Sequence, residues 1–135
     1  MMERLDKNTL MISIYSFGYQ KNGIPVNEHG DGGGYIFDCR FLPNPHHDPK
    51  LREFTGKEKP IKEFFSDYHP VDLFIEDCIA MVELSTKAYI QKNYSNIQVS
   101  FGCTGGKHRS VYCAEKAAKK LSAKGYQIKI FHTEI

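Results

Sequence analysis

A glycine-rich segment between an apolar run and a helix-forming run constrains this chain more than any other feature. The segment reads Phe101-Gly102-Cys103-Thr104-Gly105-Gly106-Lys107-His108-Arg109-Ser110. The apolar run Ile97–Phe101 leads into it, and helix-forming residues follow from Val111 to Leu121. A strand, a tight turn and a helix in this order direct backbone N–H groups and the positive end of the helix dipole at an anion. Arg109 adds a guanidinium that suits phosphate, so we interpret the segment as a phosphate-binding loop.

The rest of the chain predicts a small α/β domain. Period-2 and β-branched patterns predict strands, and a period of 3.6 predicts helices. Strands joined through helices favour parallel pairing, so we predict one domain over residues 1–135 with a mainly parallel sheet flanked by helices. Glycines at 30–34 interrupt regular structure, and a long proline-rich loop follows at 41–59. The expected strands are 10–17, 35–40, 97–101 and 127–132, and the expected helices are 61–66, 70–93 and 110–124.

Composition excludes several classes of protein. Hydrophobic residues make up 41% of the 135 residues, which predicts an ordered core rather than disorder. The net charge of +2 is too small for a strongly basic nucleic-acid module. No apolar run is long enough to cross a membrane, and the N-terminus lacks a secretory signal. The four cysteines form no C-x-x-C pair, so we expect reduced thiols, a cytoplasmic location and no membrane partner.

Two catalytic interpretations compete for the glycine-rich loop. A nucleotide-binding P-loop requires one more residue, and His108 stands where Ser or Thr would hold Mg²⁺. A cysteine-dependent phosphatase is the stronger alternative, because Cys103, Arg109 and Ser110 fit the C-x5-R-[ST] spacing. A thiolate at a helix N-terminus would attack phosphorus in such an enzyme. Gly102 replaces the usual preceding histidine, and the general acid would have to be Asp38 or Asp48.

Two further interpretations need no catalysis. In the first, the loop binds a phosphorylated molecule and Cys103 is a small residue at the end of a strand. In the second, the glycines only form the turn between a strand and a helix. Thr104, His108 and Arg109 favour binding over a plain turn.

Two long motifs resemble the C-terminal domain of the RNase adaptor RapZ family. They are Phe37-Asp38-Cys39-Arg40-Phe41-Leu42-Pro43-Asn44-Pro45-His46 and Gly102-Cys103-Thr104-Gly105-Gly106-Lys107-His108-Arg109-Ser110-Val111-Tyr112. Shorter stretches match in the same order: Ser16–Tyr19, Gly23–Pro25, Leu51–Gly56 and Lys59-Pro60. The resemblance covers residues 12–132.

The resemblance carries expectations about fold and ligand. It implies a fold similar to a phosphofructokinase subdomain, binding of glucosamine-6-phosphate, binding of small RNAs in some members, and self-association into a homo-oligomer. Family members usually carry an N-terminal P-loop domain, which this sequence does not contain, so nucleotide hydrolysis is not carried over. The family's C-terminus often ends in a basic tail, whereas this sequence ends Phe131-His132-Thr133-Glu134-Ile135.

The preferred interpretation is a binding or regulatory module without catalytic residues or cofactor. The backbone of Thr104, Gly105 and Gly106 would hold the phosphate, Arg109 would neutralise it, and the Ser110 hydroxyl would cap the helix or touch an oxygen. The remaining candidate ligand residues are Asp38, Arg40, His46, Cys103 and His108. Structural alternatives stay open: Asp38 could pair with Arg109 or with Arg40, and His108 could be a solvated residue of the first helical turn.

A row of lysines follows one face of the last predicted helix. Lys116, Lys119, Lys120 and Lys124 recur at helical spacing. Such a row is usually a solvated surface, and the functional alternative is contact with RNA phosphates. His46, His47 and Asp48 raise the possibility of a metal site, but adjacent histidines point in different directions and no further ligand is suitably spaced. We therefore expect no metal.

Overall fold

Four short parallel strands form a single sheet in the part of the chain that the structure describes. The structure is a computed structural model that describes residues 5–27 and 32–135. The strands are β1 (Met11–Gly18), β2 (Gly34–Asp38), β3 (Asn96–Cys103) and β4 (Gln127–His132). They lie in the order β2-β3-β1-β4, and every pair is parallel. The predicted α/β class and parallel sheet are therefore confirmed.

Three α-helices connect and flank these strands. They are α1 (Lys59–Ser66), α2 (His69–Gln91) and α3 (Arg109–Ala123). The first helix begins two residues earlier than predicted, because Pro60 is well suited to the first turn of a helix. The long loop predicted at 41–59 contains one turn of 3-10 helix, η1 (Pro45–His47), in which the Asn44 side chain accepts a hydrogen bond from the His46 amide at 3.1 Å.

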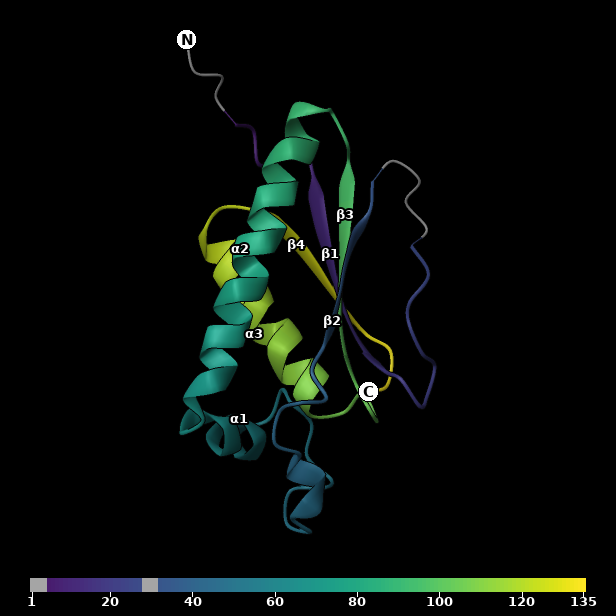
Figure 1. Cartoon of the computed structure of the whole chain (residues 1–135), viewed down its shortest axis with the longest axis vertical. Helices are drawn as coiled ribbons and strands as arrows, with labels where there is room; N and C mark the ends of the chain where they lie inside the picture. Colours follow the sequence, from purple (N-terminus) through teal and green to yellow (C-terminus); the bar gives the residue numbers. More distant parts are fainter. Residues whose placement is uncertain (1–4, 28–31) are drawn as a thin grey trace.

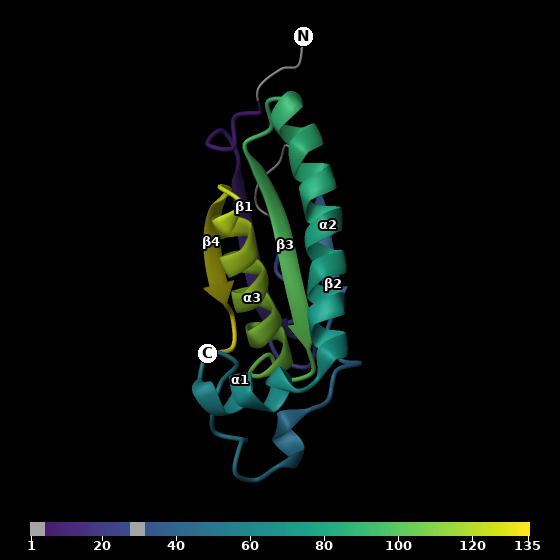
Figure 2. The same ribbon diagram turned by 90° about the vertical axis from the view of Figure 1, so that its left-hand side faces the viewer.

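Helices α2 and α3 lie side by side on one face of the sheet, as Figures 1 and 2 show. The strand side chains on that face are apolar and buried, and Ile12, Ile14 and Phe101 are each 0% exposed. They pack against apolar residues of both helices, including Ile75 of α2 and Leu121 of α3. This burial is the main driving force for the fold.

The opposite face of the sheet carries polar side chains. Ser13, Asn96 and Ser100 are buried there, and the Asn96 amide donates to the Ser13 hydroxyl at 2.9 Å. The chain after β1 runs along this side before it reaches β2 (Figure 1). Of the glycines predicted to interrupt the chain at 30–34, Gly32 and Gly33 lie in this connection and Gly34 begins β2. Gly30 and Asp31 lie outside the described residues, as do Met1–Arg4 of the N-terminus.

The carboxyl ends of all four strands meet at one end of the molecule, where ligands bind in sheets of this type. Helix α1, the turn η1 and the C-terminus gather at the same end (Figures 1 and 2). The glycine-rich loop joins β3 to α3 here. The fold therefore brings this loop next to the segments 40–56 and 18–22.

Candidate functional site

The loop between β3 and α3 presents unpaired backbone amides. From Thr104 to Arg109, no backbone N–H donates a hydrogen bond within the part of the chain that the structure describes. Gly106 has a φ of +73°, which glycine adopts at little cost. Because α3 begins at Arg109, its dipole adds partial positive charge to these amides. Unpaired amides at a helix N-terminus are the features of an anion-binding site.

Packing against the end of β1 holds the loop in this shape. The Tyr19 and Gln20 amides donate to the Cys103 and Thr104 carbonyls at 2.8 and 3.1 Å. Gly18 lies so close that a Cβ atom there would meet the Gly105 carbonyl carbon at 2.7 Å. The Cys103 and Thr104 carbonyls are therefore bonded to the chain that follows β1, and the loop amides are left for another partner.

Cys103 and Ser110 form a buried pair at the base of the loop. The Cys103 thiol donates to the Ser110 hydroxyl at 3.2 Å, and the Ser110 amide donates to the Cys103 sulfur at 3.4 Å. Ser110 is 0% exposed and Cys103 is 2% exposed. Ser110 does not cap α3, because His108 occupies the N-cap position. The pair joins the end of β3 to the first turn of α3.

Arg109 is buried beside the loop. One terminal nitrogen donates to the carbonyls of Arg40 and Leu42 at 2.8 and 3.2 Å, and the other lies 3.4 Å from the Thr104 hydroxyl. Its Nε is buried without a partner in the described chain. Within the described residues no carboxylate forms an ion pair with this guanidinium: Asp38 pairs with Arg40 instead, at 2.7 Å, although its charge also interacts with that of Arg109. A buried positive charge without an ion-pair partner favours a bound anion.

His108 is also buried rather than solvated. Its Nε2 lies 3.2 Å from the Arg52 carbonyl oxygen, and its ring lies 6.4 Å from that of His46. Burial lowers the pKa of His108, with carbonyls of Arg52 and Phe54 acting in the opposite direction. His108 is therefore neutral at pH 7 in the free protein.

A hollow of about 330 Å³ opens over the loop. It brings together four cationic side chains and one acidic one, so its net charge is positive. The Glu53 carboxylate lies 3.9 Å from Lys107 Nζ and is mostly exposed, so it offsets little of this charge. The charged and polar residues that line it are Lys21, Asn44, His46, Arg52, Glu53, Thr104, Lys107, His108 and Arg109.

A second, more open hollow adjoins the first. It measures about 720 Å³ and shares Asn44, Thr104 and Arg109 with the first. Arg40 and Asp48 also line it, together with other residues of segment 42–48 and Phe64. The two hollows meet at Arg109, so one bound molecule could contact both.

The structure brings most of the predicted site residues together. His46, Cys103, Thr104, Gly105, His108 and Arg109 line the first hollow, and Arg40 lines the second. Asp38, Gly106 and Ser110 line neither. The Asp38 carboxylate is held by the Arg40 side chain and its amide, which lowers the pKa of Asp38. The Arg40 guanidinium also lies over the Tyr19 ring at 3.9 Å.

Sequence reasoning missed three cationic residues of the first hollow: Lys21, Arg52 and Lys107. Arg52 and Lys107 lie within the family motifs, but their positions in the motifs did not indicate which way they point. Arg52 Nε donates to the His46 carbonyl at 2.7 Å, and the Gly56 amide donates to the Lys107 carbonyl at 2.9 Å. These bonds dock segment 46–56 on the loop, which is a tertiary contact that no local pattern contains.

The predicted lysine row on α3 is divided in two. Lys120 forms an ion pair with Glu76 of α2, and Lys124 pairs with Glu83 at 3.0 Å. Lys116 lies with its ammonium 5.8 Å from the centre of the Tyr112 ring, and Lys119 forms no ion pair in the described chain. Half of the row is therefore neutralised by α2.

The described residues contain neither a metal-binding cluster nor a membrane-spanning helix. No group of three His, Cys, Asp or Glu side chains there is arranged to hold a metal ion. Across 5–27 and 32–135, no helix has both the length and the apolar character to cross a bilayer.

The fold and the loop define a small parallel α/β domain with a glycine-rich loop between β3 and α3. Comparison with known families matches residues 10–135 to the RapZ C-terminal domain, and the chain belongs to this family. The RNase adapter protein RapZ of Yersinia enterocolitica is 44% identical over 123 residues, which are 91% of this chain and 41% of that protein.

Proteins named only as nucleotide-binding proteins are similarly related. The one from Psychromonas ingrahamii is 42% identical over 130 residues, covering 93% of this chain and 42% of its own length. The one from Thermotoga neapolitana is 38% identical over 126 residues, covering 93% of this chain and 43% of its own length. The chain thus spans about two fifths of the length of these relatives.

Proposed function

We propose that this domain binds a phosphorylated small molecule at the loop 103–109 and acts as a regulatory module. The unpaired amides from Thr104 to Arg109 carry this proposal. Six consecutive N–H groups at a helix N-terminus, beside a buried guanidinium with no carboxylate partner, are suited to a tetrahedral dianion. Lys21, Arg52 and Lys107 add positive charge around the same hollow.

The adjoining hollow favours a sugar as the body of the ligand. It offers the Asn44 amide, the Asp48 carboxylate and the Arg40 guanidinium, which suit hydroxyl and amino groups. An amino-sugar phosphate such as glucosamine-6-phosphate would place its phosphate on the loop and its amine towards Asp48. Asp38 remains a second candidate for the amine only if its ion pair with Arg40 opens.

Relatedness to an RNase adapter supports a regulatory role. RNA binding is proposed only for the unpaired half of the lysine row, because Lys120 and Lys124 already form ion pairs with α2. If RNA binds this face, retention of structured RNA should fall steeply with salt and depend on Lys116 and Lys119. A homo-oligomer and a cytoplasmic location remain predictions that sizing and localisation can test.

Calorimetric titration tests the ligand directly. We expect glucosamine-6-phosphate to bind, and glucosamine without its phosphate to bind at least 100-fold more weakly. Glucose-6-phosphate keeps the phosphate but lacks the amine, so its affinity measures the contribution of the amine alone. Arg109→Ala should abolish binding, whereas Lys87→Ala on the exposed side of α2 should leave it unchanged. Equal affinity for phosphorylated and unphosphorylated sugars would refute the proposal.

A cysteine-dependent phosphatase is the second candidate. The Ser110 amide donates to the Cys103 sulfur at the start of α3, so the sulfur lies at a helix N-terminus, where such enzymes place their nucleophile. Of the two predicted general acids, only Asp48 lines the hollows. Hydrolysis of p-nitrophenyl phosphate that Cys103→Ser abolishes, with ligand affinity retained, would establish catalysis. No turnover, with intact ligand binding, is the outcome we expect.

A further inference from the structure

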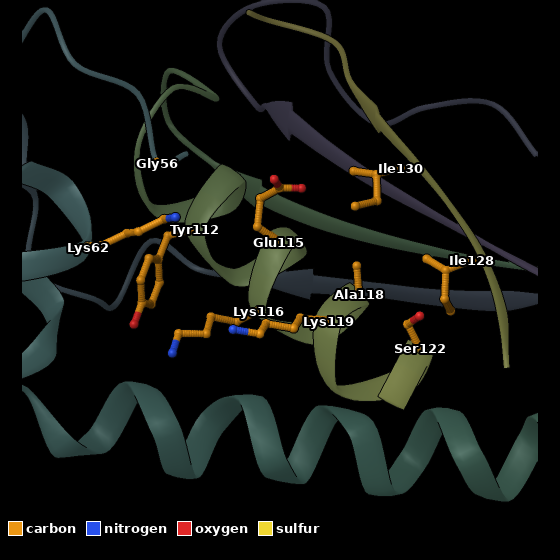
Figure 3. A pocket seen from close by; sticks show the side chains of 10 residues that line it. All are labelled: Gly56, Lys62, Tyr112, Glu115, Lys116, Ala118, Lys119, Ser122, Ile128 and Ile130. Atoms are coloured by element: carbon orange, nitrogen blue, oxygen red, sulfur yellow. The ribbon is translucent and has the colours of Figure 1, made fainter. Parts of the chain in front are cut away.

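A third hollow, of different chemistry, lies between α1, α3 and β4, away from the loop 103–109. Its volume is about 490 Å³, within the range of small-molecule sites. Figure 3 shows its lining, with Lys62 and Gly56 at one end and Ile128 and Ile130 of β4 at the other. We call this hollow the α3–β4 groove. Of its lining residues, only Lys116 and Lys119 are candidate functional residues in the sequence.

The floor of the groove is apolar because β4 is an edge strand with no helix beyond it in the described chain. Ile130 pairs in register with Ile14, which is fully buried, yet Ile130 is 39% exposed. Helix α3 reaches only part of the way over β4 and contributes Ala118 to the floor (Figures 2 and 3). The apolar surface of the sheet therefore continues out of the core and into the groove.

The rim of the groove is cationic, and its charges are free. Lys62, Lys116 and Lys119 line it, and none of them forms an ion pair in the part of the chain that the structure describes. Their neighbours on α3, Lys120 and Lys124, are both paired with α2. The fold thus neutralises the lysines that face α2 and leaves those at the groove without a counter-ion.

The one acidic side chain in the groove is already engaged. Glu115 lies 3.3 Å from Nε2 of His132, whose Nδ1 lies 2.5 Å from the Ser16 hydroxyl. Tyr112 forms part of the wall, and burial raises the pKa of Tyr112 to about 12, so its hydroxyl stays protonated and can donate to an anion. The groove therefore combines three cations without an ion-pair partner in the described chain, one carboxylate bonded to His132 and a hydroxyl donor with an apolar floor.

We propose that the α3–β4 groove is a second binding site, for a free small molecule that joins an apolar ring to an anionic group. The ring would lie on Ala118, Ile128 and Ile130, and the anion would meet Lys116, Lys119 and Lys62. Lys62 and Gly56 lie at one end of the groove (Figure 3). The volume of about 490 Å³ suits a compact molecule better than a partner helix, which would continue past the groove. The site is independent of the phosphate loop and of the function proposed for it.

Titration with 8-anilinonaphthalene-1-sulfonate, an aromatic ring system with one anionic group, tests this site in the folded protein. Fluorescence should show saturable binding at one site, with amide shifts in an NMR spectrum confined to the groove. The double variant Lys116→Ala/Lys119→Ala should weaken binding roughly tenfold, about 1.4 kcal/mol. Ile130→Thr keeps the β-branched shape and should weaken it by roughly threefold, since it removes apolar contact. Lys120→Ala, on the same helix but outside the groove, is the matched control and should bind normally.

Several results would overturn the proposal. The uncharged N-phenyl-1-naphthylamine binding as tightly as the sulfonate would show that the lysines play no part. Unchanged affinity in the double lysine variant would also show that the lysines play no part. Loss of binding in Ile36→Thr would place the probe on the opposite face of the sheet. Groove variants that reduce RNA retention without altering probe binding would assign the lysines to nucleic acid. Inorganic phosphate titrated against the same variants should bind unchanged, which separates this site from the loop.

Discussion

The hollow over the loop 103–109 and the α3–β4 groove are built in different ways. The loop hollow combines loop residues held by contacts with the end of β1 and the buried side chains of His108 and Arg109 with exposed cations such as Lys21 and Arg52. The α3–β4 groove is made mainly of side chains, with lysines that lie on the surface of α1 and α3 and an apolar floor left open by an edge strand. A backbone site depends on the exact path of the chain, whereas a side-chain site tolerates changes in the backbone and depends on charge.

Substitution of a loop glycine should produce the largest effect. In Gly106→Ala, a φ of +73° is strained, and the new Cβ would meet the Gly18 nitrogen at 2.6 Å and the Phe17 carbonyl carbon at 2.8 Å. We expect the free energy of unfolding to fall by about 2–4 kcal/mol and anion binding to be lost. Urea unfolding and phosphate titration measure the two effects.

Gly105→Ala is the matched control for that experiment. A Cβ at Gly105 meets no atom within 4 Å, so stability should change little. Because probe binding in the α3–β4 groove does not use this loop, both variants should bind 8-anilinonaphthalene-1-sulfonate normally wherever they remain folded. A Gly106→Ala protein as stable as the wild type would show that the loop is more adaptable than its contacts indicate.

These contrasts explain which parts of the molecule the sequence could predict. The strand–loop–helix order around Gly105 and Gly106 is encoded locally, so the glycine-rich loop between a strand and a helix and the parallel sheet were predictable. Asp38 and Ser110 were placed in the site by their position in the motifs, yet Asp38 turns to Arg40 and Ser110 to Cys103.

The α3–β4 groove could not be predicted, because it depends on the order of the strands. Ile130 is an exposed floor residue because β4 lies at the edge of the sheet beside β1. In the same way, the helical spacing of the lysines was read correctly, but the division between paired and free lysines depends on where α2 lies. Long-range contacts of this kind leave no periodic signal in the sequence.

Ionic strength should affect anion binding at the two sites to different extents, and this is the next largest effect. The groove lysines are solvated, so their attraction for an anion is screened by salt, while the buried amides and Arg109 are screened much less. Between 50 and 500 mM sodium chloride, we expect the affinity for 8-anilinonaphthalene-1-sulfonate to fall by roughly fivefold to tenfold. Sulfate binding at the loop, followed by calorimetry, should fall less. Equal salt dependence at both sites would mean that the loop hollow is as solvated as the groove.

Acidic pH should destabilise the protein through its buried histidines. Burial lowers the pKa of His108, and burial also lowers the pKa of His132 despite the nearby Glu115. A lowered pKa means that the unfolded state takes up protons first, so stability is complete above about pH 6.5, the unfolded value, and is lost as the pH falls below it. Thermal unfolding between pH 7.5 and 5 measures this loss.

His108→Gln identifies the contribution of the loop to that pH dependence. The variant should lose less stability than the wild type between pH 6.5 and 5. Adding His132→Gln should reduce the remaining loss of stability further. Sulfate, which stays dianionic over this range, should protect the wild type more at pH 5.5 than at pH 7.5, because an anion in the loop hollow favours protonated His108. An identical pH profile in wild type and His108→Gln would show that this side chain is not the titrating group.

The smallest effect concerns the lysines that face α2. Glu76→Gln removes the partner of Lys120 at a largely solvated position and should lower the free energy of unfolding by no more than about 0.5 kcal/mol. Glu83→Gln should cost more, about 1 kcal/mol, because Glu83 is less exposed and accepts hydrogen bonds from both Lys124 and Tyr126. Urea unfolding of both variants measures the difference. Since each substitution frees one lysine without touching the α3–β4 groove, affinity for the aromatic sulfonate should stay unchanged, and a gain in affinity would show that any free lysine on α3 can serve as the anion's partner.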